Sequence, residues 1–169
     1  NDALDGIRKY VADLATVLMT KADKELSHDL VEYAIAIETV GDIVVKRLVH
    51  RAMQKSKKKV EFSRDGFREL CSMHEQVLSN ISLAANVLIS DDLESARLLL
   101  EEKTECAVRE RSSRKKHLSR LQAGAQISFD SSNIHLETLR ALKDLNSQIA
   151  TVAFPILLRG GQLLETRLI

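Results

Sequence analysis

The feature that most constrains this fold is an apolar spacing of three and four residues that runs through almost the whole chain. One proline and six glycines interrupt it among 169 residues. Such spacing gathers apolar side chains on one face of a helix and does not fit the alternation of a strand. Breakers divide the chain into segments at about 2–21, 26–55, 63–89, 91–122 and 131–158. We therefore predict an all-α fold, a single domain over residues 1–169 built from long antiparallel helices.

Polar and helix-breaking residues mark the ends of these segments. Ser63 is predicted to cap the third helix, Asp91 with Glu94 to form a capping box on the fourth, and "DSSN" to cap the fifth. Pro155 lacks a backbone N–H and should bend or end the last helix, with "RGG" closing it shortly afterwards. Residues 159–169 are expected to form a tail, in which "QLLETRLI" begins a further helix or docks elsewhere.

The charge balance excludes several function classes. With 25 Lys and Arg against 24 Asp and Glu, the net charge of +1 does not predict binding to nucleic acid or to a membrane surface. Aromatic residues are 4% of the chain, too few for a base-stacking surface. The apolar run "VAFPILL" falls short of the roughly 18 residues that span a bilayer. We expect a soluble piece of a longer protein, with no nucleic-acid partner.

The second segment carries two neighbouring apolar lines, and the first is expected to pack against the bundle. Its members recur at alternating spacings of four and three: Leu30, Ala34, Ile37, Gly41, Val44 and Leu48. The second line contains Glu38 and Asp42, within "AIAIETVGDIVVKRL". Gly41 is expected to let another helix approach closely, so that both carboxylates lie at the edge of the core.

Glu38 and Asp42 are four residues apart on one helix face, where like charges repel by about 0.2–0.5 kcal/mol. Ion pairs are one form of compensation, from Lys46 to Asp42 and from Arg8 to Glu38. A divalent or ferric cation is the other, because carboxylate oxygens from one helix can share such an ion with ligands from another. The spacing alone favours ion pairing and leaves the metal site open.

The second segment can be laid on the fifth so that their apolar residues coincide. The matched pairs are Ala34 with Leu139, Ile37 with Leu142, Val40 with Leu145, Val44 with Ile149 and Leu48 with Ala153. This match indicates a duplicated helical unit, although two amphipathic helices can also agree by chance. In the same alignment Lys143 stands opposite Glu38 and Ser147 opposite Asp42, so the acidic pair is not repeated.

The run "VRERSSRKKHLSRL" concentrates positive charge within about three helical turns. Its cations are Arg109, Arg111, Arg114, Lys115, Lys116 and Arg120. They are distributed around the helix, and the pairs Glu105 with Arg109 and Glu110 with Arg114 favour a solvated, self-paired face. Together with "KSKKK", the run is also a candidate contact for phosphate, acidic lipid headgroups or an acidic partner.

No constellation of residues predicts catalysis. The sequence has no nucleophile elbow and no glycine-rich phosphate loop. A helical di-metal enzyme needs an ExxH motif on two helices, whereas this chain has one, from Glu25 to His28 at the start of a helix. We therefore do not expect an enzyme, and we retain the di-metal enzyme only as a third alternative.

A family resemblance appears in the string "SSNIHLETLRALKDLNSQIATVAFPIL". It resembles the closing helix of the PhoU-like domain at the C-terminus of bacterial sodium/phosphate cotransporter family proteins, and "HLSRLQAG" and "IETVGDIVVKRL" fit the same pattern. The resemblance implies a bundle of two three-helix repeats from which the first helix is missing. Residues 1–55 would then end repeat one, residues 63–158 would form repeat two, and residues 159–169 would be the tail.

The resemblance also implies a function. PhoU proteins bind metal clusters through a helical E/DxxxD motif in each repeat, which Glu38 and Asp42 match and which Lys143 and Ser147 do not. The implied role is a regulatory or accessory domain in phosphate uptake, on the cytoplasmic side of the bacterial inner membrane. Its implied partner is the membrane portion of the same polypeptide. A second copy of the chain, in a homo-oligomer, is the other partner considered. The alternative is a free-standing PhoU-like regulator of phosphate signalling.

Overall fold

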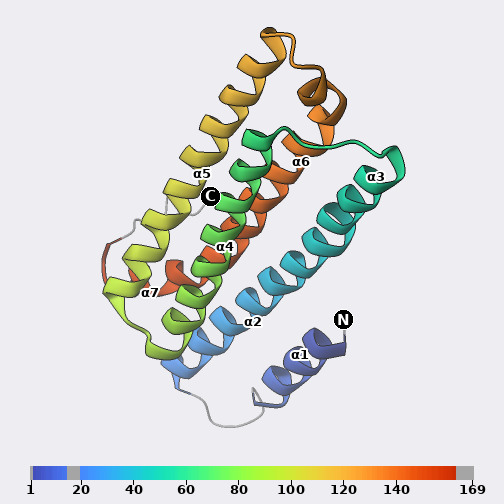
Figure 1. The fold of residues 1–169 in the computed structure, drawn as a ribbon. Coiled ribbons are helices and arrows are strands. Elements are labelled where there is room, and N and C mark those ends of the chain that lie inside the picture. Colours follow the sequence, from blue (N-terminus) through green and yellow to red (C-terminus); the bar gives the residue numbers. More distant parts are fainter. Residues whose placement is uncertain (1, 15–19, 163–169) are drawn as a thin grey trace.

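The computed structural model describes residues 2–14 and 20–162, which form a helical bundle (Figure 1). No strand occurs within these ranges, so the all-α prediction is confirmed. The elements, in chain order, are α1 (Asp2–Leu14), α2 (Lys21–Asp42), the π-helical η1 (Ile43–Val49), α3 (His50–Lys58), α4 (Arg64–Ser90), α5 (Leu93–Gln122), α6 (Gln126–Ile149), the 3₁₀ turn η2 (Ala150–Val152) and α7 (Ala153–Arg159).

The second predicted segment is one continuous rod formed by α2, η1 and α3. It begins at Lys21, earlier than predicted, because Thr20 and Asp23 form a capping box that the sequence analysis missed. The Asp23 amide donates to the Thr20 hydroxyl at 3.2 Å, and the Thr20 amide donates to the Asp23 carboxylate at 3.0 Å. Two orphan N–H groups are thereby satisfied. The predicted end of the first segment includes residues 15–19, which lie outside the described residues.

Of the predicted caps of α4 and α5, the structure confirms the first and corrects the second. Ser63 does cap α4, with its hydroxyl 3.2 Å from the Gly66 amide. The cap of α5 is Asp92, which accepts a hydrogen bond from the Ser95 amide at 2.8 Å. Asp91 instead ends α4 in the left-handed region, at φ 50°. The geometry of the turn determines which of the two adjacent aspartates caps α5, and the sequence does not specify that geometry.

The start of α6 was also predicted too late. This helix begins at Gln126, so Ser131 from "DSSN" lies inside it, where its hydroxyl donates to the Ile127 carbonyl at 2.9 Å. That bond satisfies Ser131 within the helix and removes it as a cap. The serine-rich string is therefore part of the first turns of α6.

Pro155 interrupts the last helix as predicted, but the break lies upstream of it. The α6 helix ends at Ile149, and the 3₁₀ turn η2 carries the chain to Ala153. A proline ring clashes with the carbonyl of the residue four positions earlier, which here is Thr151 in the 3₁₀ turn. The α7 helix then ends at Arg159 before Gly161, whose φ of 67° suits glycine. The predicted tail beyond residue 162 lies outside the described residues.

The core forms where α4, α5 and α6 pack against one another. The α2 rod packs against α6, and α1 lies beside α2 at the outside of the bundle (Figure 1). None of the described helices is both long and apolar enough to cross a bilayer. The main buried apolar side chains are Leu70, Met73, Val77, Leu99, Cys106, Leu139, Leu142, Leu145 and Ile149.

The packing face of α2 lies one residue away from the predicted line. Ala36 and Ile43 are buried, whereas Ile37 and Val44 of the predicted line are 45% and 37% exposed. A Cβ atom built on Gly41 would have no atom of the described residues within 4 Å, so none of the described helices approaches closely there and that prediction is wrong. The buried positions belong to neither of the two predicted lines, because the rod has apolar residues on more than one face and periodicity alone does not decide which face packs against α6.

Candidate functional site

The acidic pair lies at the junction of α2 and η1, on the outside of the bundle. Asp42 forms an ion pair with Lys46 at 2.7 Å, as the spacing predicted. Glu38 is half-buried and makes no hydrogen bond or ion pair with any other described residue. Arg8, its predicted partner, pairs with Asp5 at 3.6 Å instead. The two carboxylates are therefore compensated unequally.

The fit of these residues to a metal ion is incomplete. Within residues 2–14 and 20–162, no group of three or more His, Cys, Asp or Glu side chains could hold a metal. Hard cations need more oxygen ligands than the two carboxylates supply, and Lys46 already holds Asp42. The metal site at Glu38 and Asp42 stays a prediction. The metal content of the purified chain and of an E38A/D42A variant tests it.

The repeat-related positions Lys143 and Ser147 lie on α6. Lys143 pairs with the Asp144 carboxylate at 2.9 Å, and Arg47 from η1 reaches the same carboxylate at 2.8 Å. Burial raises the pKa of Asp144, but hydrogen bonds from Lys143 and Arg47 outweigh that effect, so this pKa lies below its ordinary value. Lys143 and Asp144 both belong to α6, so the contact from Arg47 is the one of the two that joins the α2 rod to α6.

The six cations of the basic run do not share one surface. Arg109, Lys116 and Arg120 line a groove between α4 and α5, whereas Arg111 and Arg114 line a separate groove between α5 and α6. Lys115 is exposed and lines neither groove. Successive residues of a helix point about 100° apart, so a continuous run on α5 is divided between its two neighbours.

The α4–α5 groove, of about 650 Å³, holds an ordered set of polar contacts. Arg120 donates two hydrogen bonds to the Glu69 carboxylate, both at 2.9 Å. Arg109 donates to the Ser72 hydroxyl at 2.9 Å and forms no pair with Glu105, contrary to the sequence prediction. The other predicted pair, Glu110 with Arg114, is present at 3.8 Å.

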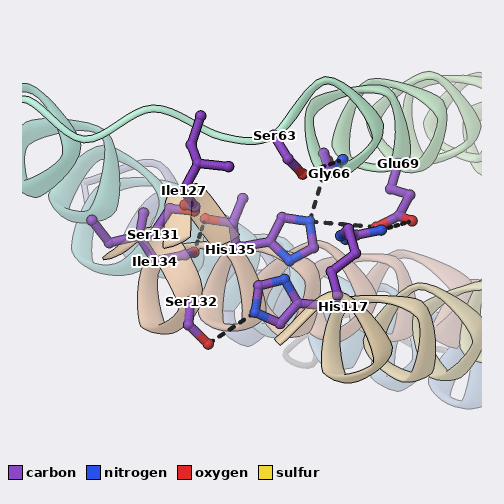
Figure 2. A network of polar contacts seen from close by, with 11 residues as sticks. Ser63, Gly66, Glu69, His117, Ile127, Ser131, Ser132, Ile134 and His135 are labelled. Carbon is purple, nitrogen blue, oxygen red and sulfur yellow. Dashed lines mark hydrogen bonds and ion pairs between the residues drawn. The ribbon is translucent and has the colours of Figure 1, made fainter. Parts of the chain in front are cut away.

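Two buried histidines, His117 and His135, lie beside Glu69 of this set (Figure 2). The His117 and His135 rings stack with centroids 4.7 Å apart. His117 Nε2 lies 2.8 Å from the Ser132 hydroxyl, and His135 Nε2 lies 3.2 Å from the Gly66 carbonyl. That carbonyl only accepts, so His135 Nε2 carries the proton. His135 Nε2 also lies 3.6 Å from the Glu69 carboxylate, so the cluster joins α4, α5 and α6.

Burial keeps both rings neutral. Loss of hydration lowers the pKa of His135 to about 4, with a further contribution from His117, against the opposing effects of the Gly66 hydrogen bond and of Glu69. The pKa of His117 is also lowered, first by burial and then by the charge of Arg120. Two neutral stacked rings are suited to packing α4, α5 and α6 together. A general base would need a pKa closer to 7.

The sequence contained a signal for this cluster that the analysis missed. His117 continues the buried face of α5 at helical spacings, after Cys106, Glu110 and Ser113. Polar residues at core positions of a helix indicate a buried polar network. The histidines of this chain do not recur at ligand spacing within one segment, so spacing gives no signal for a pair that forms between α5 and α6.

A third pocket, of about 830 Å³, opens between α2, the end of α4 and α7. Arg159 lies at its rim, where its guanidinium binds Asp29 of α2 at 2.7 Å and Asp91 of α4 at 2.8 Å. The lining is mostly apolar, including Leu30 and Tyr33. This pocket therefore offers a surface for apolar contact and no catalytic constellation.

Comparison with known proteins finds relatives of one kind. The chain is 30% identical over 151 residues to the "Putative inorganic phosphate export protein YjbB" of Escherichia coli strain K12, which covers 89% of this chain and 28% of the relative. The protein of the same name in Salmonella typhimurium is 29% identical over 156 residues, covering 92% of this chain and 29% of the relative. The chain thus spans less than a third of the length of these relatives. No family model and no solved structure matches it.

Proposed function

We propose that this chain is a non-catalytic regulatory or accessory domain of a longer phosphate transporter, and that it acts in phosphate homeostasis. The observation that carries this proposal is the similarity itself, because nearly the whole chain matches a limited part of proteins named for inorganic phosphate export. A domain of that kind would control transport through contacts with the rest of the polypeptide, on the cytoplasmic side of the bacterial inner membrane.

The proposal has two forms, one in which the transporter imports phosphate and one in which it exports phosphate. The PhoU-like resemblance implies sodium-dependent uptake, whereas the name of the relatives concerns export. We favour export, because identity over most of the chain is a broader basis than a few motif strings. A free-standing regulator is less well supported, since the matched segment is only 28% of the relatives.

The outer face of α2 supports a contact with another part of the polypeptide. Leu30 and Ile37 of α2, with Val44 of η1, form an exposed apolar line along the rod. A contiguous exposed apolar line of this kind commonly marks an interaction surface. Packing of a further helix against this line would bury it.

The test uses the full-length transporter in cells that lack it. We expect the intact protein to change the rate of radiolabelled phosphate efflux with phosphate supply, and a version without residues 1–169 to lose that response. A second test variant replaces Ile37 and Val44 with Ser, which removes the proposed apolar contact without changing the buried residues of the core, and it should also lose the response. Identical efflux and uptake for all three proteins at low and high phosphate would overturn the proposal.

A further inference from the structure

The groove between α5 and α6 is strongly cationic. Its volume is about 500 Å³, and one acid, Glu110, faces it among many bases. The bases that line it are Lys103, Arg111, Arg114, Arg140 and Lys143. Like charges brought together in this way repel one another and attract a counter-anion.

Two of these cations have no acidic partner among the described residues. Among the described residues, Arg111 makes no hydrogen bond or ion pair. The ammonium nitrogen of Lys103 lies 4.7 Å from the centroid of the Phe154 ring, and no described carboxylate pairs with it. Burial lowers the pKa of Lys103, because its ammonium has lost part of its hydration. A desolvated ammonium gains from an anion placed beside it.

The remaining cations are paired with carboxylates. Arg114 lies 3.8 Å from Glu110, the one acid that lines the groove, while Arg140 binds Glu137 at 3.0 Å and Lys143 binds Asp144 at 2.9 Å. Glu137 and Asp144 do not line the groove, so Arg140 and Lys143 can still present N–H groups to a ligand there. Positive charge therefore remains in excess at the groove.

The hydroxyl groups of the groove already donate their hydrogen bonds to backbone carbonyls. Thr104 donates to the Leu100 carbonyl at 3.0 Å, and Ser147 donates to the Lys143 carbonyl at 3.1 Å. Their protons are already used within their own helices, so the donors for a ligand come from the lysine and arginine side chains. Guanidinium groups match the oxygen atoms of an oxyanion two at a time.

We propose that the α5–α6 groove is a binding site for a phosphate-type oxyanion, either free inorganic phosphate or the phosphate of a lipid headgroup. Lys143 and Ser147 stand where the repeat comparison would require an acidic pair, and this change converts a cation-binding pattern into part of an anion site. The inference rests on the groove and does not depend on the transport role, because binding is measured without transport.

The α4–α5 groove is the weaker candidate for such a ligand. Two carboxylates line it, Asp65 and Glu69, and they hold Arg68 at 3.3 Å and Arg120 at 2.9 Å. Two of the four cations that line it, Arg68 and Arg120, are thus neutralised by acids within the groove itself. An anion placed there would meet both carboxylates as well as the cations.

The first experiment titrates inorganic phosphate into the 169-residue chain at constant ionic strength, followed by amide chemical shifts in NMR. We expect shifts at α5 and α6, and about tenfold weaker binding in Arg111→Gln and in Lys143→Gln, since each removes a charged hydrogen bond. Glu110→Gln should bind phosphate more tightly. Lys115→Gln, outside both grooves, is the matched control and should bind like the wild type.

The second experiment measures sedimentation of the chain with phosphatidylcholine vesicles that contain or lack phosphatidylglycerol. Sedimentation that needs the acidic lipid and is lost in Arg111→Gln and Lys143→Gln would identify a headgroup as the ligand. Phosphate binding without such sedimentation would identify the free ion. Absence of both, or binding that Lys115→Gln weakens as much as Lys143→Gln, would overturn the proposal. Failure here would leave the efflux response untouched, so the two proposals fail separately.

Discussion

Acidification should destabilise this bundle through His135. The side chain is 1% exposed, and its pKa falls from an ordinary 6.5 to about 4 in the folded state. As the pH drops below 6.5, the unfolded chain takes up a proton at this ring while the folded chain does not. The unfolded state then binds more protons, so the free energy of unfolding decreases with falling pH.

The size of this effect follows from the two pKa values. One unit of pKa shift corresponds to about 1.4 kcal/mol, which gives about 3 kcal/mol for the whole window between pH 6.5 and pH 4. At pH 5 the linkage relation assigns about 2 kcal/mol of that loss to His135. His117 contributes in the same direction, because its pKa is lowered too.

The assay is urea unfolding followed by far-ultraviolet circular dichroism at pH 7 and pH 5. The variant is His135→Gln, whose amide can still donate to the Gly66 carbonyl but does not titrate. We expect the wild type to lose about 2 kcal/mol more between the two pH values than His135→Gln does. His74→Gln changes an exposed histidine and should keep the wild-type pH dependence. Equal losses in wild type and His135→Gln would refute the assignment of a buried neutral ring.

Three other substitutions test the packing of the bundle. Glu69→Ala should lower the free energy of unfolding by about 3 kcal/mol, because Arg120 is 18% exposed and would lose its carboxylate; an unchanged urea midpoint would mean that this pair acts like a surface pair. Asn146→Ala should cost about 1–3 kcal/mol by leaving the buried Asn80 amide, now 2.9 Å from it, without a partner. The double change to Leu at both positions should recover part of that loss. Leu139→Ala should cost about 2–5 kcal/mol in thermal or urea unfolding, since its side chain is fully buried.

Helix existence could be predicted from the sequence, while helix orientation about its own axis could not. The segment boundaries depend on local chemistry, and most of them lie within a few residues of their predicted places. The start of α2 was missed because a Thr20–Asp23 capping box is a weaker sequence signal than the Ser-x-x-Glu form. The face of α2 depends on the position of α6, and no residue of α2 alone contains that information.

The same distinction between local and tertiary information applies to the candidate sites. The pair of Asp42 with Lys46 is local, and the spacing predicted it correctly. The separation of Arg109 from Arg111 into different grooves is tertiary, because it requires that α4 and α6 lie on two sides of α5. A run of charge in a sequence therefore predicts a surface only when the neighbours of its helix are known.

Polar residues on the buried face of α5 connect the core with both grooves. Glu110, at the end of the apolar part of this face, contacts Arg114 in the α5–α6 groove, while His117 stacks on His135, which lies beside Glu69 of the α4–α5 groove. A helix that only needed stability would have apolar residues at these positions, since burial of unpaired charge is costly. Glu110 is paired within α5 by Arg114, whereas His117 is satisfied by α6 through Ser132 and His135. The contacts of His117 hold α5 in one rotation against α6, and in that rotation Arg111 lines one groove and Arg109 the other.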